Sequence, residues 1–194
     1  MPTMIDDGTD PERWHMAHGL GISASSIPKA MTPAGRRVFV HNFLHPKTLD
    51  ASVSKRMDVY MAYGRQREDE FIGAWIEKRF DIAPNKALFA SDINPRFLAT
   101  PDGWDPILRQ IAEFKTSTTP PPRTIKREHR DQMTAQCIVM GTERCLYVHE
   151  QHEDFTPVNM PVTEWFYPDP ERRLQIIQTM EILLFEIDLA KAAA

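Results

Sequence analysis

Four short runs of β-type residues in the middle of the chain limit the folds that it can adopt. The runs are ALFASDI, RFLATPDG, ILRQIAEFK and RCLYVH, and they are bounded by Pro, Gly and Asp, as strands are. Helical patterns lie before, between and after them, at residues 55–80, 128–140 and 169–194. Because helices and strands are mixed along the chain, we expect an α/β domain with a small central mixed sheet flanked by helices.

The length of 194 residues suits one domain, for which we expect residues 13–194, preceded by a polar tail at residues 1–12. Hydrophobic residues make up 42% and charged residues 26%, which excludes a disordered or fibrous class. No apolar run approaches the roughly 18 residues of a membrane span, and the polar start is unlike a signal peptide. We therefore expect a cytoplasmic protein with no membrane contact.

The two cysteines, Cys137 and Cys145, are too few for a disulfide framework, and we expect both to be reduced and buried. Together with His149 and His152 they superficially suggest a zinc site. Their spacings fit no common zinc finger, and HEQH is not the HExxH of metalloproteases. We therefore do not expect zinc.

One acid interrupts the apolar stripe of the helix expected at residues 55–80. Counting along the helix places Glu68 on the apolar face, where a carboxylate requires a partner. The partner would be a group of a functional site or, for an ordinary helix acid, Arg65 or a cation from the solvent. The stripe itself consists of Met57, Tyr60, Met61, Gly64, Ile72, Trp75 and Ile76.

Two further helix starts follow from capping patterns. Ser25 or Ser26 can cap a short helix with Pro28 in its first turn, which is a possible anion site. Asp169 caps the last helix with Pro170 at its first position. The inner face expected for this last helix consists of Leu174, Ile177, Met180, Leu184 and Ile187.

The stretch ATPDGWDPILRQIAEFKTS carries the chemistry. If residues 96–100 and 107–115 pair as neighbouring strands, alternation places Glu113 and Lys115 on one face, with Asp102 at the end of the first strand. Two close carboxylates repel each other unless a cation lies between them, and all-oxygen ligands suit Mg2+ or Mn2+. Lys115 can then act on a water or hold the charge that grows on a phosphate. The alternative is a turn followed by a surface Glu and Lys.

Five motifs in order resemble one family. The chain contains WHMAHGLGISAS, GRQRE, TPDG, EFK and QMTAQ, which together span about two thirds of it. In this order they resemble the PD-(D/E)xK nucleases, and within them the lambda exonuclease and YqaJ-type viral recombinase family. The resemblance implies a restriction-endonuclease-like core.

The resemblance also implies roles for individual residues. Asp102 and Glu113, with the backbone carbonyl of Phe114, would hold the metals. Lys115 would serve the attacking water. Glu68 would reach the second metal directly or through a water.

Outside the metal site, the resemblance implies that Gln132 positions the Lys115 region, against the alternative of a solvated helix residue. Ser25 would bind a DNA phosphate, and it can cap a helix at the same time. The chain departs from the family at two positions: His18 replaces an arginine, and Thr134 replaces a glutamine found in some members. The first departure bears on how a 5'-phosphate is held.

A basic stretch, PPPRTIKREHR, precedes the glutamine-bearing helix. Its cations can contact phosphates, or they can form an ordinary solvated face. The candidate DNA-binding cations are Arg65, Arg123, Lys126 and Arg127.

These features predict a deoxyribonuclease with two Mg2+ ions, for which Mn2+ substitutes, acting 5' to 3' on linear duplex DNA with a 5'-phosphate. The alternatives are a RecB-like single-strand nuclease, a restriction-type endonuclease, and an accessory module that binds DNA without cleaving it. The resemblance further implies phage-type recombination, a single-strand annealing protein as partner, and a homotrimer.

Overall fold

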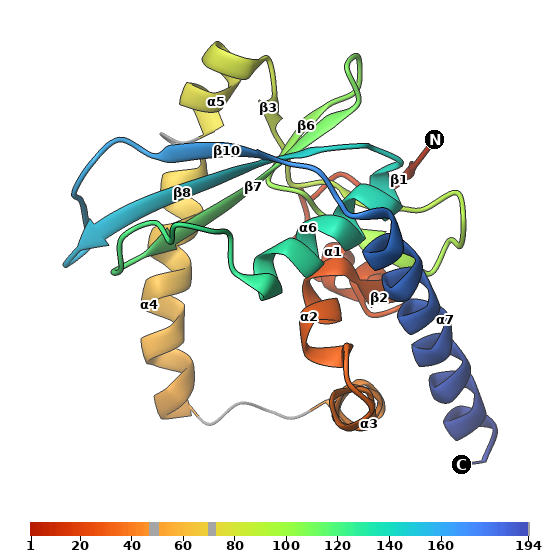
Figure 1. Ribbon diagram of the computed structural model, residues 1–194. Helices are drawn as coiled ribbons and strands as arrows, with labels where there is room; N and C mark the ends of the chain where they lie inside the picture. Colours follow the sequence, from red (N-terminus) through yellow and green to blue (C-terminus); the bar gives the residue numbers. More distant parts are fainter. Residues whose placement is uncertain (47–50, 70–72, 194) are drawn as a thin grey trace.

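The computed structural model describes residues 1–46, 51–69 and 73–193, and it confirms an α/β fold of sheets flanked by helices (Figure 1). The four-residue helix α2 follows a single 3-10 turn, η1, while α7 is the longest helix. The helices are α1 (Pro11–His18), η1 (Ala24–Ser26), α2 (Ile27–Ala30), α3 (Pro33–Leu44), α4 (Ala51–Arg67), α5 (Gly73–Phe80), α6 (Arg127–Met140) and α7 (Pro170–Ala192).

The larger sheet is mixed, as expected, and β7 lies at its centre. This strand runs parallel to β8 and antiparallel to β6. Its two faces carry different cores, because Ile111 packs in one cluster while Ala112 and Phe114 pack in another. In spatial order the strands are β10 (Val162–Phe166), β8 (Cys145–Glu153), β7 (Gln110–Ser117), β6 (Gly103–Asp105) and β3 (Ala83–Pro84), with β9 (Thr156–Pro157) paired to the end of β8.

A second sheet includes the N-terminus, so the first 12 residues are not the expected tail. Asp10 caps α1 through its side chain, and Arg13 donates to Asp6 at 2.5 Å. Strand pairing and this ion pair hold a segment whose polar sequence alone does not indicate order. The strands, in spatial order, are β1 (Thr3–Asp6), β4 (Leu88–Ala90), β5 (Phe97–Ala99) and β2 (Ile22–Ser23).

The pairing expected between residues 96–100 and 107–115 is wrong. Strand β5 belongs to the smaller sheet, whereas β7 belongs to the larger one. The chain turns at Pro101–Asp102 and begins a separate strand, β6, which returns to β7 through a turn with Arg109 at φ 51°. Asp102 therefore precedes the hairpin partner of β7, with Gly103 opposite Ala112.

The helix expected at residues 55–80 is interrupted. A π-helical turn at Glu68 and Asp69 follows α4, and a new helix, α5, begins at Gly73. Tyr60 and Met61 are exposed rather than buried, whereas Gly64 and Ile76 are buried and Trp75 is half-buried. Ile72 and the side chain of Met57 lie outside the described residues.

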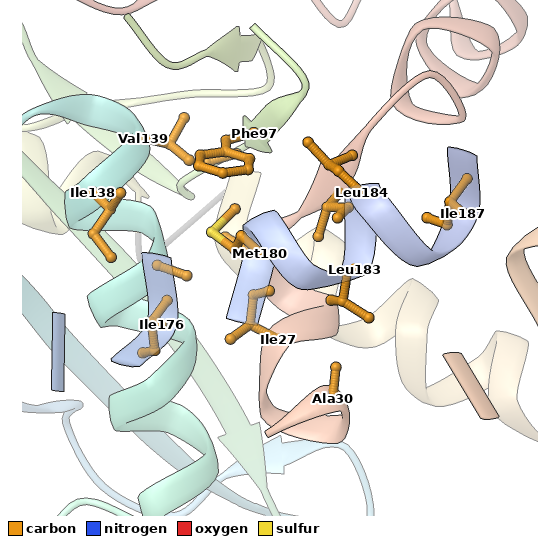
Figure 2. Close-up of a cluster of buried hydrophobic side chains, with 14 residues drawn as sticks. Ile27, Ala30, Phe97, Ile138, Val139, Ile176, Met180, Leu183, Leu184 and Ile187 are labelled. Atoms are coloured by element: carbon orange, nitrogen blue, oxygen red, sulfur yellow. The ribbon is translucent and has the colours of Figure 1, made fainter. Parts of the chain in front are cut away.

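Helix α7 closes one core against α6 and α2 (Figure 2). Asp169 accepts a hydrogen bond from the backbone of Arg172 at 2.8 Å, which confirms the predicted cap. Leu174, placed on the inner face, is instead exposed. Steps of three residues drift around a helix by about 60° each, so Leu174 lies away from the buried stripe. That stripe consists of Ile176, Met180, Leu183, Leu184 and Ile187.

Helix α6 agrees closely with the prediction at residues 128–140. Cys137 and Cys145 are free and buried, as expected, and burial raises the pKa of both thiols. In the part of the chain that the structure describes, no helix is both long and apolar enough to cross a membrane.

Candidate active site

The Pro101–Asp102 turn is held from two sides. Asn85 donates its backbone N–H to the carbonyl of Asp102 at 2.8 Å and its side-chain amide to the carbonyl of Pro101 at 2.7 Å. The Asp102 carboxylate accepts the backbone N–H of Phe114 on β7 at 2.6 Å. These contacts fix Asp102 beside the end of the central strand.

Glu113 is buried on β7 and is held by α6. Gln132 donates to its Oε1 at 2.6 Å, and Gln136 donates to its Oε2 at 2.5 Å. The two glutamines are one helical turn apart, so both reach the same carboxylate. The predicted link between Gln132 and the central acid–base pair is therefore present, while the contact of Gln136 was not predicted.

Lys115 lies on the same face of β7 as Glu113 and donates to its Oε1. Burial opposes the positive charge of Lys115, but the carboxylates of Glu113 and Asp102 outweigh it and raise its pKa above the ordinary value. Lys115 is consequently an ammonium group in this arrangement. It can attract phosphate or hold the negative charge that develops on it.

Glu68 reaches this group from a distant part of the sequence. A Cβ at Gly64 would lie 3.5 Å from Thr116 Oγ1 on β7 and 3.9 Å from Glu68 Oε1. These are ordinary van der Waals distances, so Gly64 lies next to both β7 and Glu68 at the end of α4. Within the described residues Glu68 forms no ion pair, so the alternative of an ion pair with Arg65 is not observed there. Arg65 instead donates a hydrogen bond from Nε to the carbonyl of Met61 at 3.3 Å.

The carboxylates repel one another. Burial, followed by the charges of Glu113 and Glu68, raises the pKa of Asp102 well above its usual value. Burial and the charge of Glu113 raise the pKa of Glu68 to about 7, and Lys115 opposes this shift. Such mutual shifts mark a cluster of negative charge that one ammonium group does not balance.

Two hollows meet at this cluster. A cleft of about 850 Å3, here called the main cleft, is lined by Glu68, Phe114 and Lys115, with His18 and Ser25 also on its wall. A neighbouring pocket of about 390 Å3 is lined by Glu68 and Asp102. Trp14, His15, Arg65 and Glu68 line both hollows, and of these only Arg65 and Glu68 were predicted.

The serine turn differs in detail from the prediction. Ser26 occupies the cap position of α2 without a side-chain cap, and Ser25 Oγ lies 2.9 Å from Ser23 Oγ. His18 stacks on Trp14, with ring centroids 4.6 Å apart. Burial, and then the neighbouring His15, lower the pKa of His18. His18 is therefore neutral at pH 7.

The basic stretch does not join the candidate residues in the main cleft. Arg127 lines a separate hollow of about 450 Å3, with Asp131 and Arg172 also on its wall. Arg123 and Lys126 are exposed, and neither lines the main cleft. The structure therefore gathers Glu68, Asp102, Glu113, Phe114, Lys115, Gln132, Ser25, His18 and Arg65, and leaves Arg123, Lys126 and Arg127 outside.

Sequence reasoning missed the contribution of β8 to this region. His152 lines the main cleft, and Glu150 binds Arg67 beside Glu68. The run RCLYVH identified the strand but stopped before these polar residues. Alternation continued past His149 would have placed buried polar side chains on a central strand, which is an unusual signal.

Solved structures of exonucleases share this arrangement of helices and strands. LHK-Exo in complex with dAMP matches with a TM-score of 0.69 at 18% identity, over 92% of this chain and 93% of that chain. The chain has the fold of an alkaline exonuclease. LHK-Exo is the alkaline exonuclease from Laribacter hongkongensis, and another of its structures matches with a TM-score of 0.65, over 94% and 97%.

A second protein has the same fold. The phage-related exonuclease from Haemophilus somnus 129PT matches with a TM-score of 0.65 at 12% identity, over 90% of this chain and 97% of that chain. No family model and no curated protein matches the sequence. At these low sequence identities the similarity shows the fold alone.

Proposed function

We propose that this protein is a metal-dependent DNA exonuclease of the lambda exonuclease and YqaJ-type family. The observation that carries the proposal is the convergence of Glu68, Asp102, Glu113 and Lys115 where the main cleft meets the neighbouring pocket. The exonuclease fold of the solved neighbours supports it. The chemistry would be hydrolysis of a phosphodiester bond.

The residues fit a divalent cation by the chemistry of their donors. Asp102, Glu113, Glu68 and the carbonyl of Phe114 offer only oxygen atoms, as Mg2+ and Mn2+ prefer. The raised pKa values of Asp102 and Glu68 indicate negative charge that a cation would offset. In residues 1–46, 51–69 and 73–193 no three such side chains already enclose a metal position, and Glu113 is turned toward Lys115 and the two glutamines.

Bound Mg2+ would lower the pKa of a water and offset charge on the phosphate. The protein's own residues have separate tasks. Lys115 would hold its proton and place a positive charge beside the phosphate. Gln132 and Gln136 would hold the Glu113 carboxylate in one orientation, since each binds one of its oxygens.

For the DNA end, we propose that Ser25 and His18 bind a 5'-phosphate, which supports action from 5' to 3' on linear duplexes. Both residues line the cleft that contains Lys115. Arg65 lines it too and would contact the DNA backbone. From the family resemblance, the proposal includes a cytoplasmic role in phage-type recombination, as a homotrimer with an annealing protein.

The test is degradation of end-labelled linear duplex by the purified chain, with Mg2+ or with EDTA. We expect Mg2+-dependent release of nucleotides from 5' ends, and no cleavage of closed circles. Asp102→Asn, Glu113→Gln and Lys115→Met should each lower the rate on the order of a thousandfold, because charge stabilisation worth several kcal/mol is lost.

Asp188→Asn is the matched control. Asp188 is an exposed acid of α7, paired with Arg96 at 2.7 Å, and its replacement should leave the rate unchanged. Cleavage of closed circles would favour the endonuclease alternative. Binding of DNA with no cleavage under any metal would favour the accessory module.

A further inference from the structure

Four aromatic rings gather at the wall of the main cleft, where the β8–β9 hairpin meets α4. Phe155 lies in the hairpin turn, with its ring centroid 5.1 Å from Tyr60 and 5.7 Å from His152. Tyr63 packs beside them, 4.6 Å from His152 and 5.3 Å from Phe155. Tyr60 and His152 line the main cleft itself. Tyr60 and His152 therefore share the hollow of Glu68 and Lys115, and Tyr63 and Phe155 pack directly against them.

Packing of the hairpin does not account for all of this cluster. Tyr63 has a structural role, because its hydroxyl reaches Glu150 at 3.4 Å. Tyr60 and Phe155 remain 45% and 40% exposed. Large aromatic rings that serve only the core are normally covered more completely. Each of these two rings thus keeps a surface available for another molecule.

The backbone at Phe155 is unfavourable for a bulky residue. Asp154 and Phe155 form the two-residue turn, with φ of 45° and 61°. Turns with two left-handed residues favour Asn or Asp followed by Gly, and a side chain with a Cβ is strained there. For the turn alone, glycine would be better at position 155. The ring at this position therefore indicates a use beyond turn formation.

His152 supports the exposed rings. The residue is almost fully buried, at 2% exposure, and its ring stacks on that of Phe155 with an angle of 12° between the planes. Because His152 is covered, the free ring surface at this wall belongs to Tyr60 and Phe155.

We propose that Tyr60 and Phe155, supported by the buried ring of His152, form a subsite that stacks on one unpaired nucleobase of the DNA strand bound in the main cleft. The inference rests on the proposed function for the presence of DNA there. Aromatic stacking accepts any base, because every base has a π face.

The subsite has an expected position along the strand. Tyr60 precedes Glu68 by eight residues, which corresponds to about 12 Å along a helix. Nucleotides in a stacked strand are about 3.4 Å apart. The stacked base would therefore lie within about four nucleotides of the phosphate that meets the carboxylates.

The experiment measures binding without cleavage. A short single strand carries one 2-aminopurine, a fluorescent base that stacking quenches, at successive positions, and binding is followed in EDTA. We expect quenching by the wild-type protein at one position within about four nucleotides of the 5' end. Phe155→Gly and Tyr60→Leu should abolish that quenching and raise Kd about tenfold or more.

Two controls distinguish the loss of an aromatic ring from a loss of folding. Phe155→Gly removes the ring while suiting the turn, so its thermal unfolding midpoint should not fall, and Phe155→Trp should keep the quenching. Phe185→Leu removes another exposed ring, at 67% exposure on α7, and should leave both quenching and Kd unchanged.

Unchanged quenching and Kd in both Phe155→Gly and Tyr60→Leu would overturn the subsite, as would failure of the wild-type protein to bind the strand. The Mg2+-dependent assay on linear duplex reports separately on the proposed function. Cleavage without ring-dependent quenching would contradict the subsite and support the nuclease function. Ring-dependent quenching without cleavage would support the subsite and contradict the nuclease function.

Discussion

Arg67 and Glu150 form a two-point ion pair that joins the end of α4 to β8. Arg67 Nε lies 2.9 Å from Oε1, and Nη2 lies 2.6 Å from Oε2. The Glu150 side chain is 0% exposed and that of Arg67 is 20% exposed. Because Arg67 directly precedes Glu68, this ion pair fixes the position of Glu68 at the cleft.

Removing one member of this pair should destabilise the protein strongly. Arg67→Met leaves the buried carboxylate of Glu150 uncompensated, for which we expect a loss of about 3–5 kcal/mol in the free energy of unfolding. The double variant Arg67→Met with Glu150→Leu should lose clearly less, since no charge remains buried. Urea denaturation measures both variants.

The control is the exposed pair Arg96–Asp188, where Asp188→Asn should change the free energy of unfolding little, because exposed ion pairs contribute little to stability. Equal losses in the single and double variants would show that the α4–β8 contact depends on packing instead of charge.

Gln136 should matter for activity although it does not line the cleft. Its amide holds Glu113 Oε2 at 2.5 Å in the interior. Gln136→Leu removes the hydrogen bond that orients this oxygen, so we expect a loss of about 10- to 100-fold in metal affinity or rate. Calorimetric titration with Mn2+ and the rate on linear duplex measure this. Gln178→Leu, an exposed position on α7, is the matched control and should change neither.

Glu68 should make the metal-free protein less stable as pH rises. Burial and Glu113 raise its pKa from 4.5 to about 7, so between these values the folded state binds more protons than the unfolded state. The corresponding stabilisation is complete below pH 4.5 and is lost as pH rises through about 7. It amounts to at most about 3 kcal/mol.

Urea denaturation in EDTA at pH 5 and pH 8 measures this dependence. Glu68→Gln should reduce it, leaving the part that comes from the raised pKa of Asp102. The variant should gain stability relative to the wild-type protein at pH 8. Mn2+ affinity of the wild-type protein should rise over the same pH range, because the metal needs the ionised carboxylate. Parallel pH profiles for the two proteins would contradict the raised pKa.

Preference for a 5'-phosphate should depend on pH through His18. Burial and His15 lower the pKa of His18 below its usual 6.5, so it carries charge only at acidic pH. We expect the rate ratio of phosphorylated to hydroxyl ends to increase several-fold toward acidic pH and to be small above pH 7. In His18→Arg the preference should persist from pH 6 to 9, since arginine stays charged.

Steady-state rates on paired duplexes at fixed salt provide the measurement. Equal rates on both ends at every pH would remove the phosphate site from the proposal. A wild-type preference that does not change with pH would assign it to Ser25 and the backbone instead of His18.

The sequence by itself determined the elements with strong local signals. Asp169 and Pro170 specify the start of α7, and the spacing of Gln132 and Gln136 specifies one face of α6, because capping and helical periodicity act over a few residues. Alternation along EFK likewise placed Glu113 and Lys115 together, since successive side chains of a strand point to opposite faces.

Only the tertiary structure decided which distant segments meet. The short β6 strand comes between β5 and β7 in the sequence, and the packing of α4 brings Glu68 close to β7. Neither follows from a local pattern. The same holds for Arg67 with Glu150 and for Phe155 with Tyr60. Such contacts depend on how the elements pack as whole bodies, and the energy of each pair is realised only after the fold has brought its partners together.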